Sequence, residues 1–472
     1  MKVEQLFTRC LAEMAYYISD NGEAAIIDPL RETEPYIRMA EADQATIKYI
    51  FLTHFHADFV SGHVDLAQKT GATIVYGPNA EADFDFYTGK DNEEFAIGNI
   101  RIKLLHTPGH TMESASYLLV DEKGNTPYLF SGDALFIDDV GRPDLAVQSG
   151  SITQEDLAGF LFDSLRTKIM TLPDEVIVYP NHGAGSTCGK NMSAETFDTL
   201  GNQKETNYAL RADMTREEFI IEVTTGLQTP PQYFPKNAKM NKRINTSIEA
   251  VIYKGTTPLD AIQFKKLSEQ DDILVIDTRS KETFTEYGTV PGAWFIGADE
   301  EFAPWVGALI SDIEQKIIFI ADNGREKEIV TRFARVGYDH VQGYLVGGIS
   351  NWKEHGFQVD TIKSISAIEF AKRLEADKVG SVLDVRRASE YDSIHVLGVS
   401  NFPLDFIHKN LASLNPKQHY YLHCLSGYRS LIAASILRSY GFTKLTDIKG
   451  GFDAIIETDV PVSEYVCPTS LL

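Results

Sequence analysis

The sequence is poor in cysteine, with four in 472 residues. So few thiols cannot build a disulfide framework, and they suit a reducing compartment, where each thiol is either inert or reactive. Positive charge is also scarce: 44 Lys and Arg residues face 67 Asp and Glu residues, which gives a formal net charge of −23. This balance argues against nucleic acid and anionic membranes as partners.

Long apolar runs are missing as well. No window approaches the roughly 18 apolar residues that a membrane helix needs, and residues 1–6 show no apolar stretch after a basic start. The hydrophobic content of 43% and the charged content of 24% are typical of a globular protein. Because 472 residues are too many for one ordinary core, we expect about two to four domains in a cytoplasmic protein.

The first pattern with chemical content lies at residues 53–63, Thr-His-Phe-His-Ala-Asp-Phe-Val-Ser-Gly-His. It follows the apolar run 49–52, which predicts a buried strand. His54, His56 and Asp58 would then lie in the loop where the strand ends. Imidazole and carboxylate groups at this spacing can converge on one metal ion.

Three further strand-like runs end in the same way, beside a Gly or Pro that turns the chain. The runs, with the residue that follows each, are 100–105 with His110, 128–130 with Asp133, and 176–179 with His182. Strand ends on a rigid sheet can hold side chains accurately. The four elements together therefore predict one cluster of ligands.

In this order the four elements resemble the metallo-β-lactamase superfamily, over roughly residues 1–255. The resemblance implies an αββα sandwich with its metal site at one edge. The usual motif of that superfamily is His-x-His-x-Asp-His, and its last histidine helps to hold a second metal. Here that position is Phe59, which has no ligand atom, so a full two-metal site is disfavoured.

The simplest remaining site is one metal ion on His54, His110 and Asp133. Two histidines and one carboxylate with open positions are the arrangement of non-haem Fe(II) oxygenases. We therefore expect one Fe(II) per chain, with zinc able to replace it. The residues expected to lie nearby and orient ligands or bound water are His56, Asp58 and His182.

Within the superfamily, the finer match is to persulfide dioxygenases. The segments that resemble this family are 53–63, 106–111, 131–133, 140–144 and 182–185. Such enzymes oxidise the outer sulfur of a low-molecular-weight thiol persulfide with O2, which gives sulfite and the thiol. The resemblance puts Arg142 near the thiol substrate, and the alternative for Arg142 is a side chain that pins its loop. Cys188 follows the His182 loop, and its role is left open between the site and the core.

The pattern loosens between residues 224 and 255, where three prolines break regular structure. A locally basic patch follows the prolines. It could attract an anionic cosubstrate, but we expect a solvated tail of the first domain.

Residues after 258 contain an internal repeat of roughly 105 residues, the size of a small domain. Residues 275–279 match 382–386, and the glycine pair at 347–348 matches the pair at 450–451. Each copy alternates apolar strands with helical stretches, which is typical of an α/β domain with a parallel sheet. Both copies resemble rhodanese domains. The expected domains are 1–255, 256–361 and 362–472.

The two copies differ where chemistry would occur. In the second copy, Cys424 lies between an apolar strand run and a helical stretch at 431–439. A cysteine in such a loop faces backbone N–H groups and the positive end of the helix dipole, which favour the thiolate. We expect Cys424 to be a nucleophile that carries sulfane sulfur, with Arg429 steadying the anion. The first copy has Ala321 at this position, so a structural or docking role is expected for it.

The whole chain resembles a persulfide dioxygenase fused to a cysteine-less and an active rhodanese domain. We expect a homo-oligomer that makes sulfite from a thiol persulfide and O2, and that makes or uses thiosulfate through Cys424. One alternative is a glyoxalase II-like thioester hydrolase that uses zinc and a bound hydroxide. Another is a non-enzymatic sulfur sensor or carrier that docks to a partner.

Overall fold

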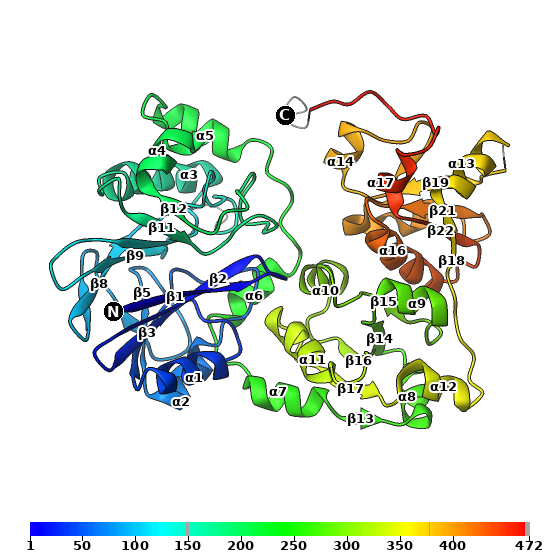
Figure 1. The fold of residues 1–472 in the computed structure, drawn as a ribbon, viewed down its shortest axis with the longest axis horizontal. Helices are drawn as coiled ribbons and strands as arrows, with labels where there is room; N and C mark the ends of the chain where they lie inside the picture. The colour runs from blue at the N-terminus through cyan, green and yellow to red at the C-terminus, as the bar shows by residue number, and fades with distance from the viewer. Residues whose placement is uncertain (148–150, 377, 468–472) are drawn as a thin grey trace. The chain divides into compact units, whose positions relative to one another are not determined.

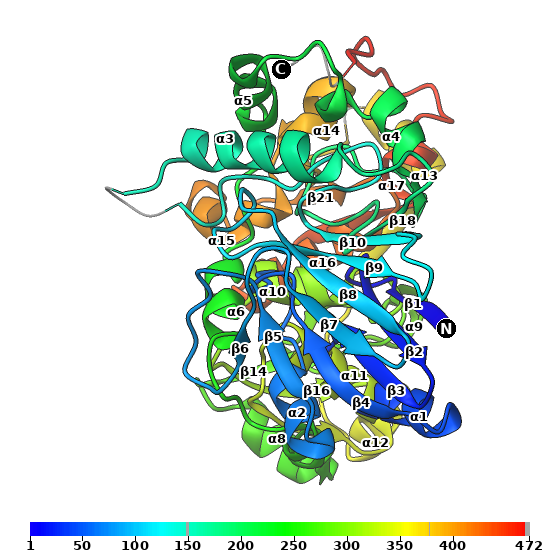
Figure 2. The same cartoon turned by 90° about the vertical axis from the view of Figure 1, so that its left-hand side faces the viewer.

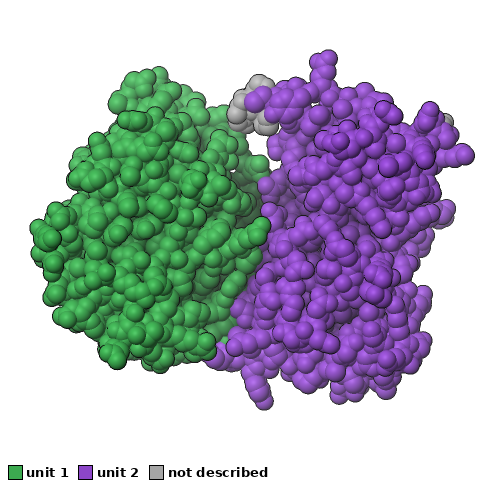
Figure 3. All heavy atoms as spheres, in the orientation of Figure 1, with its two compact units in different colours: residues 1–248, 334–337 green, residues 249–333, 338–472 purple. Residues whose placement is uncertain are grey.

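The computed structural model describes residues 1–147, 151–376 and 378–467 (Figure 1). The chain divides into two compact units, coloured separately in Figure 3. The first is Met1–Ile248 with the short segment Ala334–Gly337, and the second is Glu249–Phe333 with Tyr338–Leu472. None of the helices in the described part of the chain has the length and hydrophobicity that crossing a bilayer demands.

Two six-stranded sheets form the centre of the first unit. In the first sheet, order β1-β2-β3-β4-β5-β6, the strands are β1 (Lys2–Thr8), β2 (Glu13–Asp20), β3 (Glu23–Ile27), β4 (Thr46–Phe51), β5 (Thr73–Tyr76) and β6 (Tyr87–Thr88). In the second sheet, order β12-β11-β10-β9-β8-β7, they are β7 (Glu94–Ile97), β8 (Ile100–His106), β9 (Ala115–Val120), β10 (Tyr128–Gly132), β11 (Ile177–Pro180) and β12 (Asp198–Thr199).

Strand β2 shows why the sheets stack. Its side chains alternate between two faces, and both faces are buried. Tyr16 and Ile18 join the core that also contains Tyr117 and Phe130 of the other sheet. Tyr17 points the opposite way, into a core shared with helices. The first sheet is therefore covered on both sides.

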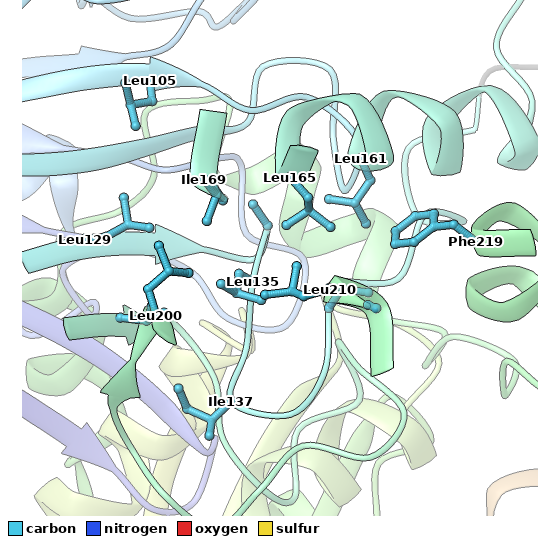
Figure 4. Close-up of a cluster of buried hydrophobic side chains, with 14 of the residues drawn as sticks. Leu105, Leu129, Leu135, Ile137, Leu161, Leu165, Ile169, Leu200, Leu210 and Phe219 are labelled. Atoms are coloured by element: carbon cyan, nitrogen blue, oxygen red, sulfur yellow. The ribbon is translucent and has the colours of Figure 1, made fainter. Parts of the chain in front are cut away.

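Helices form the outer layers of the first unit (Figure 2). They are α1 (Glu34–Ala42), α2 (His63–Thr70), α3 (Gln154–Ser164) with the π-helical segment Leu165–Ile169, α4 (Leu200–Thr206), α5 (Arg216–Thr224) and α6 (Phe234–Met240). Helix α7 (Ile248–Gly255) begins at the last residue of the segment Met1–Ile248 and otherwise belongs to the second unit. Helices α1 and α2 pack on the first sheet. On the second sheet, Leu161 of α3 and Phe219 of α5 join a cluster with Leu129 of β10 (Figure 4). This layer order confirms the predicted αββα sandwich.

The second unit contains two five-stranded sheets with the same strand order, and all their strand pairs are parallel. The first, order β13-β17-β16-β14-β15, consists of β13 (Pro258–Leu259), β14 (Ile273–Asp277), β15 (Trp294–Phe295), β16 (Lys316–Ile320) and β17 (Val341–Leu345). The second, order β18-β22-β21-β19-β20, consists of β18 (Lys363–Ser366), β19 (Ser381–Asp384), β20 (Ser400–Asn401), β21 (Tyr420–His423) and β22 (Leu445–Lys449).

Each of these sheets is accompanied by its own helices. In the first copy they are α8 (Ala261–Ser268), α9 (Lys281–Tyr287), α10 (Phe302–Leu309), α11 (Glu326–Arg335) and α12 (Gly348–Glu354). In the second they are α13 (Ala367–Glu375), α14 (Ala388–Ser393), α15 (Ile407–Asn410), α16 (Tyr428–Ser439) and α17 (Gly451–Ile455). Each copy also has its own hydrophobic cluster. The two α/β domains with parallel sheets are thus confirmed.

Candidate metal centre and cysteine loop

Three predicted metal ligands lie together at one edge of the sandwich. His54 follows β4, His110 follows β8 and Asp133 follows β10 directly. One ligand atom from each lies within 4.8 Å of the others, and all three side chains are buried. His110 Nε2 is 3.4 Å and His54 Nε2 is 3.9 Å from Asp133 Oδ2. One strand of the first sheet, β4, and two strands of the second sheet, β8 and β10, deliver these side chains.

These residues fit a metal ion. Neither carboxylate oxygen of the buried Asp133 accepts a hydrogen bond from any described residue. A buried carboxylate without partners is costly, and a bound cation would satisfy it. Burial, followed by the neighbouring histidines, lowers the pKa of His54 well below its usual value. His54 is therefore neutral, which is the form that binds metals.

Hydrogen bonds fix which ring nitrogen of each histidine faces the site. His110 Nδ1 lies 2.9 Å from the carbonyl oxygen of Arg142, which can only accept, so Nδ1 carries the proton. His54 Nδ1 is 3.0 Å from the Thr53 hydroxyl. Both contacts leave Nε2 toward Asp133, as is common for metal-binding histidines.

Asp28 connects several parts of the centre, and sequence reasoning missed it. Its buried carboxylate lies 2.9 Å from His56 Nε2, and accepts hydrogen bonds from the Thr53 N–H at 2.9 Å and from Asn181 Nδ2 at 2.6 Å. Its backbone φ is +48°, an uncommon left-handed conformation for a residue other than glycine. One signal was present in the sequence, because Asp28 ends a strand at the same sheet edge as the ligands.

A second group lies beside the first. One ligand atom each from His56, Asp58 and His182 also lies within 4.8 Å of the others. His182 Nε2 is 3.5 Å from Asp58 Oδ2 and 3.7 Å from Asp133 Oδ1. By distance alone this group could hold a further cation. Their predicted role in orienting ligands or water stays a prediction.

Phe59 packs on this second group. Its side chain is fully buried, and its ring centroid is 4.4 Å from that of His56. A hydrocarbon ring therefore stands where the superfamily's usual motif has its last histidine.

Asn241 is hydrogen-bonded to the loop that contains His56 and Phe59. The segment 224–255 is therefore not the solvated tail that the sequence led us to expect. The Asn241 amide donates to the carbonyls of His56 at 2.8 Å and Phe59 at 2.7 Å, and it accepts from the Ser61 N–H at 2.8 Å. The prolines did not prevent a helix here, because Pro235 lies in the first turn of α6, where no N–H is needed.

Arg142 is 4% exposed. Its guanidinium binds Asp144 through two hydrogen bonds of 2.6 and 2.7 Å, and it donates to the Thr187 carbonyl at 3.0 Å. These bonds match the loop-pinning alternative. Contact with a thiol substrate stays a prediction.

Cys188 lies at the centre. Its sulfur, with Asp133 and His182, forms a third group of atoms within 4.8 Å of one another. Burial, and then the charges of Asp58 and Asp133, raise the pKa of the Cys188 thiol well above its usual value. A protonated thiol therefore adjoins the predicted metal position.

The loop of Cys424 joins β21 to α16 in the second unit. The Gly427 N–H donates to Cys424 Sγ at 3.1 Å, and Gly427 has a left-handed φ of +96°. Arg429 on α16 is bonded to Glu390 on α14 through two contacts of 2.6 and 2.8 Å. Burial works to lower the pKa of Arg429, but Glu390 outweighs it and raises the pKa. The guanidinium is charged and already paired, so its predicted contact with an anion stays a prediction.

The cysteine-less copy has the same loop with a different occupant. Ala321 follows β16, where the second copy has Cys424. The Gly324 N–H, which corresponds to that of Gly427, donates to Glu326 Oε1 at 3.1 Å. The N–H that binds sulfur in the second copy therefore binds a carboxylate of the chain itself in the first.

Comparison with known proteins agrees with this architecture. The family model described as "Metallo-beta-lactamase superfamily" matches residues 8–182. The family model described as "Rhodanese-like domain" matches residues 260–355 and 366–458. A solved metallo-beta-lactamase from Staphylococcus aureus is 32% identical, with a TM-score of 0.63, and the match covers 73% of this chain and 98% of that one.

Two curated relatives each match less than half of the chain. A probable hydroxyacylglutathione hydrolase from Schizosaccharomyces pombe is 30% identical over 42% of this chain and 73% of its own length. A cytoplasmic hydroxyacylglutathione hydrolase from Arabidopsis thaliana is 32% identical over 37% of this chain and 65% of its own length. The chain belongs to the metallo-β-lactamase superfamily, and two rhodanese-like domains follow its metallo-β-lactamase domain.

Proposed function

We propose that this protein oxidises a low-molecular-weight thiol persulfide with O2 at a single Fe(II), and that Cys424 transfers sulfane sulfur in the same chain. The metal is held by His54, His110 and Asp133. The persulfide, O2 and one water give the thiol, sulfite and two protons. The outer sulfur loses four electrons, and O2 takes them up.

Phe59 carries the preference for one metal ion. It is fully buried against the His56 ring and offers no ligand atom. The remaining set of two histidines and one carboxylate leaves coordination positions on the metal free for O2 and substrate. Oxygenases need such free positions, whereas a structural metal site has none. Bound Fe(II) would supply the electron-transfer chemistry that activates O2.

The surrounding residues prepare this set of ligands. Thr53 and the Arg142 carbonyl hold the two imidazole rings with Nε2 toward Asp133. All three ligand side chains are buried, which holds them in a fixed arrangement within the sandwich.

Cys424 completes the second reaction. Its thiolate attacks the sulfane sulfur of a persulfide or of thiosulfate. The bond from that sulfur to the donor breaks, and the donor leaves as a thiolate or as sulfite. In the opposite direction, sulfite takes the sulfur from the Cys424 persulfide and thiosulfate forms.

The test is metal content and O2 uptake of the iron-loaded protein with several thiol persulfides. We expect about one iron per chain and persulfide-dependent O2 uptake with sulfite as product. Two metal ions per chain, or no O2 uptake with any persulfide, would contradict the proposal.

A zinc-dependent thioester hydrolase is the second candidate. The curated relatives carry the name hydroxyacylglutathione hydrolase, and the His56, Asp58 and His182 group could hold a second cation. This candidate predicts thioester hydrolysis by the zinc-loaded protein, without O2. The third candidate, a sulfur sensor or carrier, predicts that persulfide on Cys424 does not turn over with small acceptors.

A further inference from the structure

The cysteine-less copy contacts the helix that follows the Cys424 loop. Tyr428, Ser435 and Ser439 of α16 are seven and four residues apart, so they share one face of the helix. The Tyr428 hydroxyl donates to the Gly297 carbonyl at 2.9 Å. Ser435 Oγ accepts from the Phe295 N–H at 2.8 Å, and Ser439 Oγ accepts from Trp294 Nε1 at 2.9 Å. One face of α16 is thus bound to the first copy from end to end.

Two of these contacts are made by residues of β15, Trp294 and Phe295, at the edge of the sheet of the first copy. Strand β15 is the last strand in its sheet, so it has backbone groups without a strand partner on one side. The Phe295 N–H is used on Ser435 of α16. The ring of Phe295 also lies edge-on to the ring of Tyr428, with centroids 5.9 Å apart. Helix α16 of the second copy therefore covers part of the edge strand β15 and satisfies its Phe295 N–H.

Tyr428 is the contact nearest to the nucleophile. It directly follows Gly427, whose N–H donates to Cys424 Sγ at 3.1 Å. Any shift of the first turn of α16 moves this N–H and the positive end of the helix dipole relative to the sulfur. Gly427 has a left-handed φ of +96°, which glycine adopts without steric cost, so this N–H can turn toward the sulfur directly before the helix begins.

Resting on sulfur transfer through Cys424, we propose that the cysteine-less copy holds the Cys424 loop in its reactive geometry. Tyr428 is the positioning residue, and it acts through its hydrogen bond to the Gly297 carbonyl. This assigns a role to a domain that has no cysteine at the equivalent position and whose Gly324 N–H is bound to Glu326.

The charged groups around Tyr428 keep its hydroxyl a donor. Burial, and then the nearby carboxylates of the first copy, raise its pKa well above the usual value. Tyr428 interacts electrostatically with Asp299, Glu300, Glu301 and Arg332 of the first copy. Arg429, which follows it on α16, interacts with Glu390, and His423, which precedes Cys424, interacts with Asp384 and Arg386. Removal of the Tyr428 hydroxyl alters none of these charges.

The test is alkylation of Cys424 by iodoacetamide in the full chain, followed by peptide mass spectrometry across a pH series. Tyr428→Phe removes only the hydroxyl. At neutral pH we expect alkylation about fivefold slower, the effect of one lost hydrogen bond. We also expect the pH profile of the alkylation rate to move to higher pH, because the hydrogen bond from the Gly427 N–H to the Cys424 sulfur is weakened.

Trp294→Phe is the matched control, because it removes a hydrogen bond to the far end of the same helix. It should lower Tm in the same way as Tyr428→Phe, but keep the wild-type alkylation profile. An unchanged profile for Tyr428→Phe, or an equal shift in both variants, would overturn the positioning role. Alkylation needs neither iron nor a persulfide, so this comparison decides the matter even if the wild-type protein transfers no sulfur.

Discussion

Asp28 shows how the metal centre depends on a residue outside the predicted ligands. Its carboxylate contacts Thr53, His56 and Asn181, which belong to two different strand-end loops. Mutation of groups that orient metal ligands lowers metal affinity substantially, although these groups do not touch the metal. Asp28 is therefore the residue through which the loop geometry can be tested without touching a ligand.

Asp28→Asn should weaken iron binding about 10- to 100-fold. Asn tolerates the left-handed backbone as Asp does, so the change is limited to the carboxylate. Its amide nitrogen would face a donor, either Asn181 Nδ2 or the Thr53 N–H. Iron retained during dialysis against increasing chelator measures the effect.

Asp121→Asn is the control for this variant, because Asp121 accepts backbone hydrogen bonds in an exposed turn. It should retain iron like the wild-type protein. Equal retention by the two variants would show that Asp28 does not orient the centre.

Asp447 gives the second unit a pH-dependent stability. Burial raises its pKa from 3.8 to about 6. Between these values the folded protein binds more protons than the unfolded chain, so stability falls as the pH rises through this window. Above pH 6 the ionised carboxylate costs about 3 kcal/mol.

Asp447→Asn should therefore stabilise the second unit at pH 7 and give no gain near pH 4. Asn keeps an acceptor for the Ser430 hydroxyl, which donates to Asp447 at 2.6 Å. Urea unfolding from pH 4 to pH 7 measures the difference. A gain of the same size at both ends of the series would rule out this titration.

At this scale the sequence predicted which residues gather and not what each one does. The pattern of strand ends brought His54, His110 and Asp133 together, because it depends only on local alternation. The partners of Arg429 and Asn241 come from segments 39 and 180 or more residues away. No local pattern indicates such partners.

At the scale of elements, the loop at residues 140–144 fits tightly against the centre. A Cβ on Gly141 would lie 2.0 Å from the Asp133 carbonyl oxygen and 3.1 Å from His110 Nδ1. The next residue, Arg142, holds His110 through its carbonyl. The loop can keep both contacts only with glycine at position 141.

Gly141→Ala should displace this loop, lower stability by about 1–3 kcal/mol and abolish tight iron binding. Val140→Ala serves as the control: it removes buried methyl groups and costs stability, but adds nothing near His110. Thermal unfolding and iron content of the two variants separate the effects. Retention of iron by Gly141→Ala would show that the loop can adapt.

Helix α6 shows where prediction of elements failed. The sequence predicts a break at Pro235, but this residue lies in the first turn of α6, where proline is compatible with a helix. What orders the segment is tertiary contact, above all Asn241 beneath the His56 loop. By contrast, the strands of both rhodanese-like copies could be predicted, because buried parallel strands are apolar throughout.

At the scale of the whole molecule, the two proposed reactions use separate residues. The predicted metal ligands lie in the first unit and Cys424 lies in the second. His110→Ala should abolish persulfide-dependent O2 uptake and leave sulfur transfer at the wild-type rate. Cys424→Ser should do the opposite. Loss of O2 uptake in Cys424→Ser, with persulfide supplied, would refute this division of labour.

The repeat was visible in the sequence, and its identical strand order in both copies confirms it. How the copies contact each other could not be predicted. The contact depends on the Phe295 N–H, which has no strand partner in its own sheet and donates to Ser435 of α16. It also depends on Ser439, which like Ser435 belongs to no distinctive sequence pattern.

The carboxylate of Glu326 distinguishes the loop of the cysteine-less copy from the Cys424 loop. A cysteine introduced at Ala321 would enter a loop whose Gly324 N–H already donates to that carboxylate. Negative charge there also disfavours a thiolate. A thiol placed by Ala321→Cys alone would therefore lack the N–H donor that Cys424 has, and a reactive second cysteine in this protein would also require a change at Glu326.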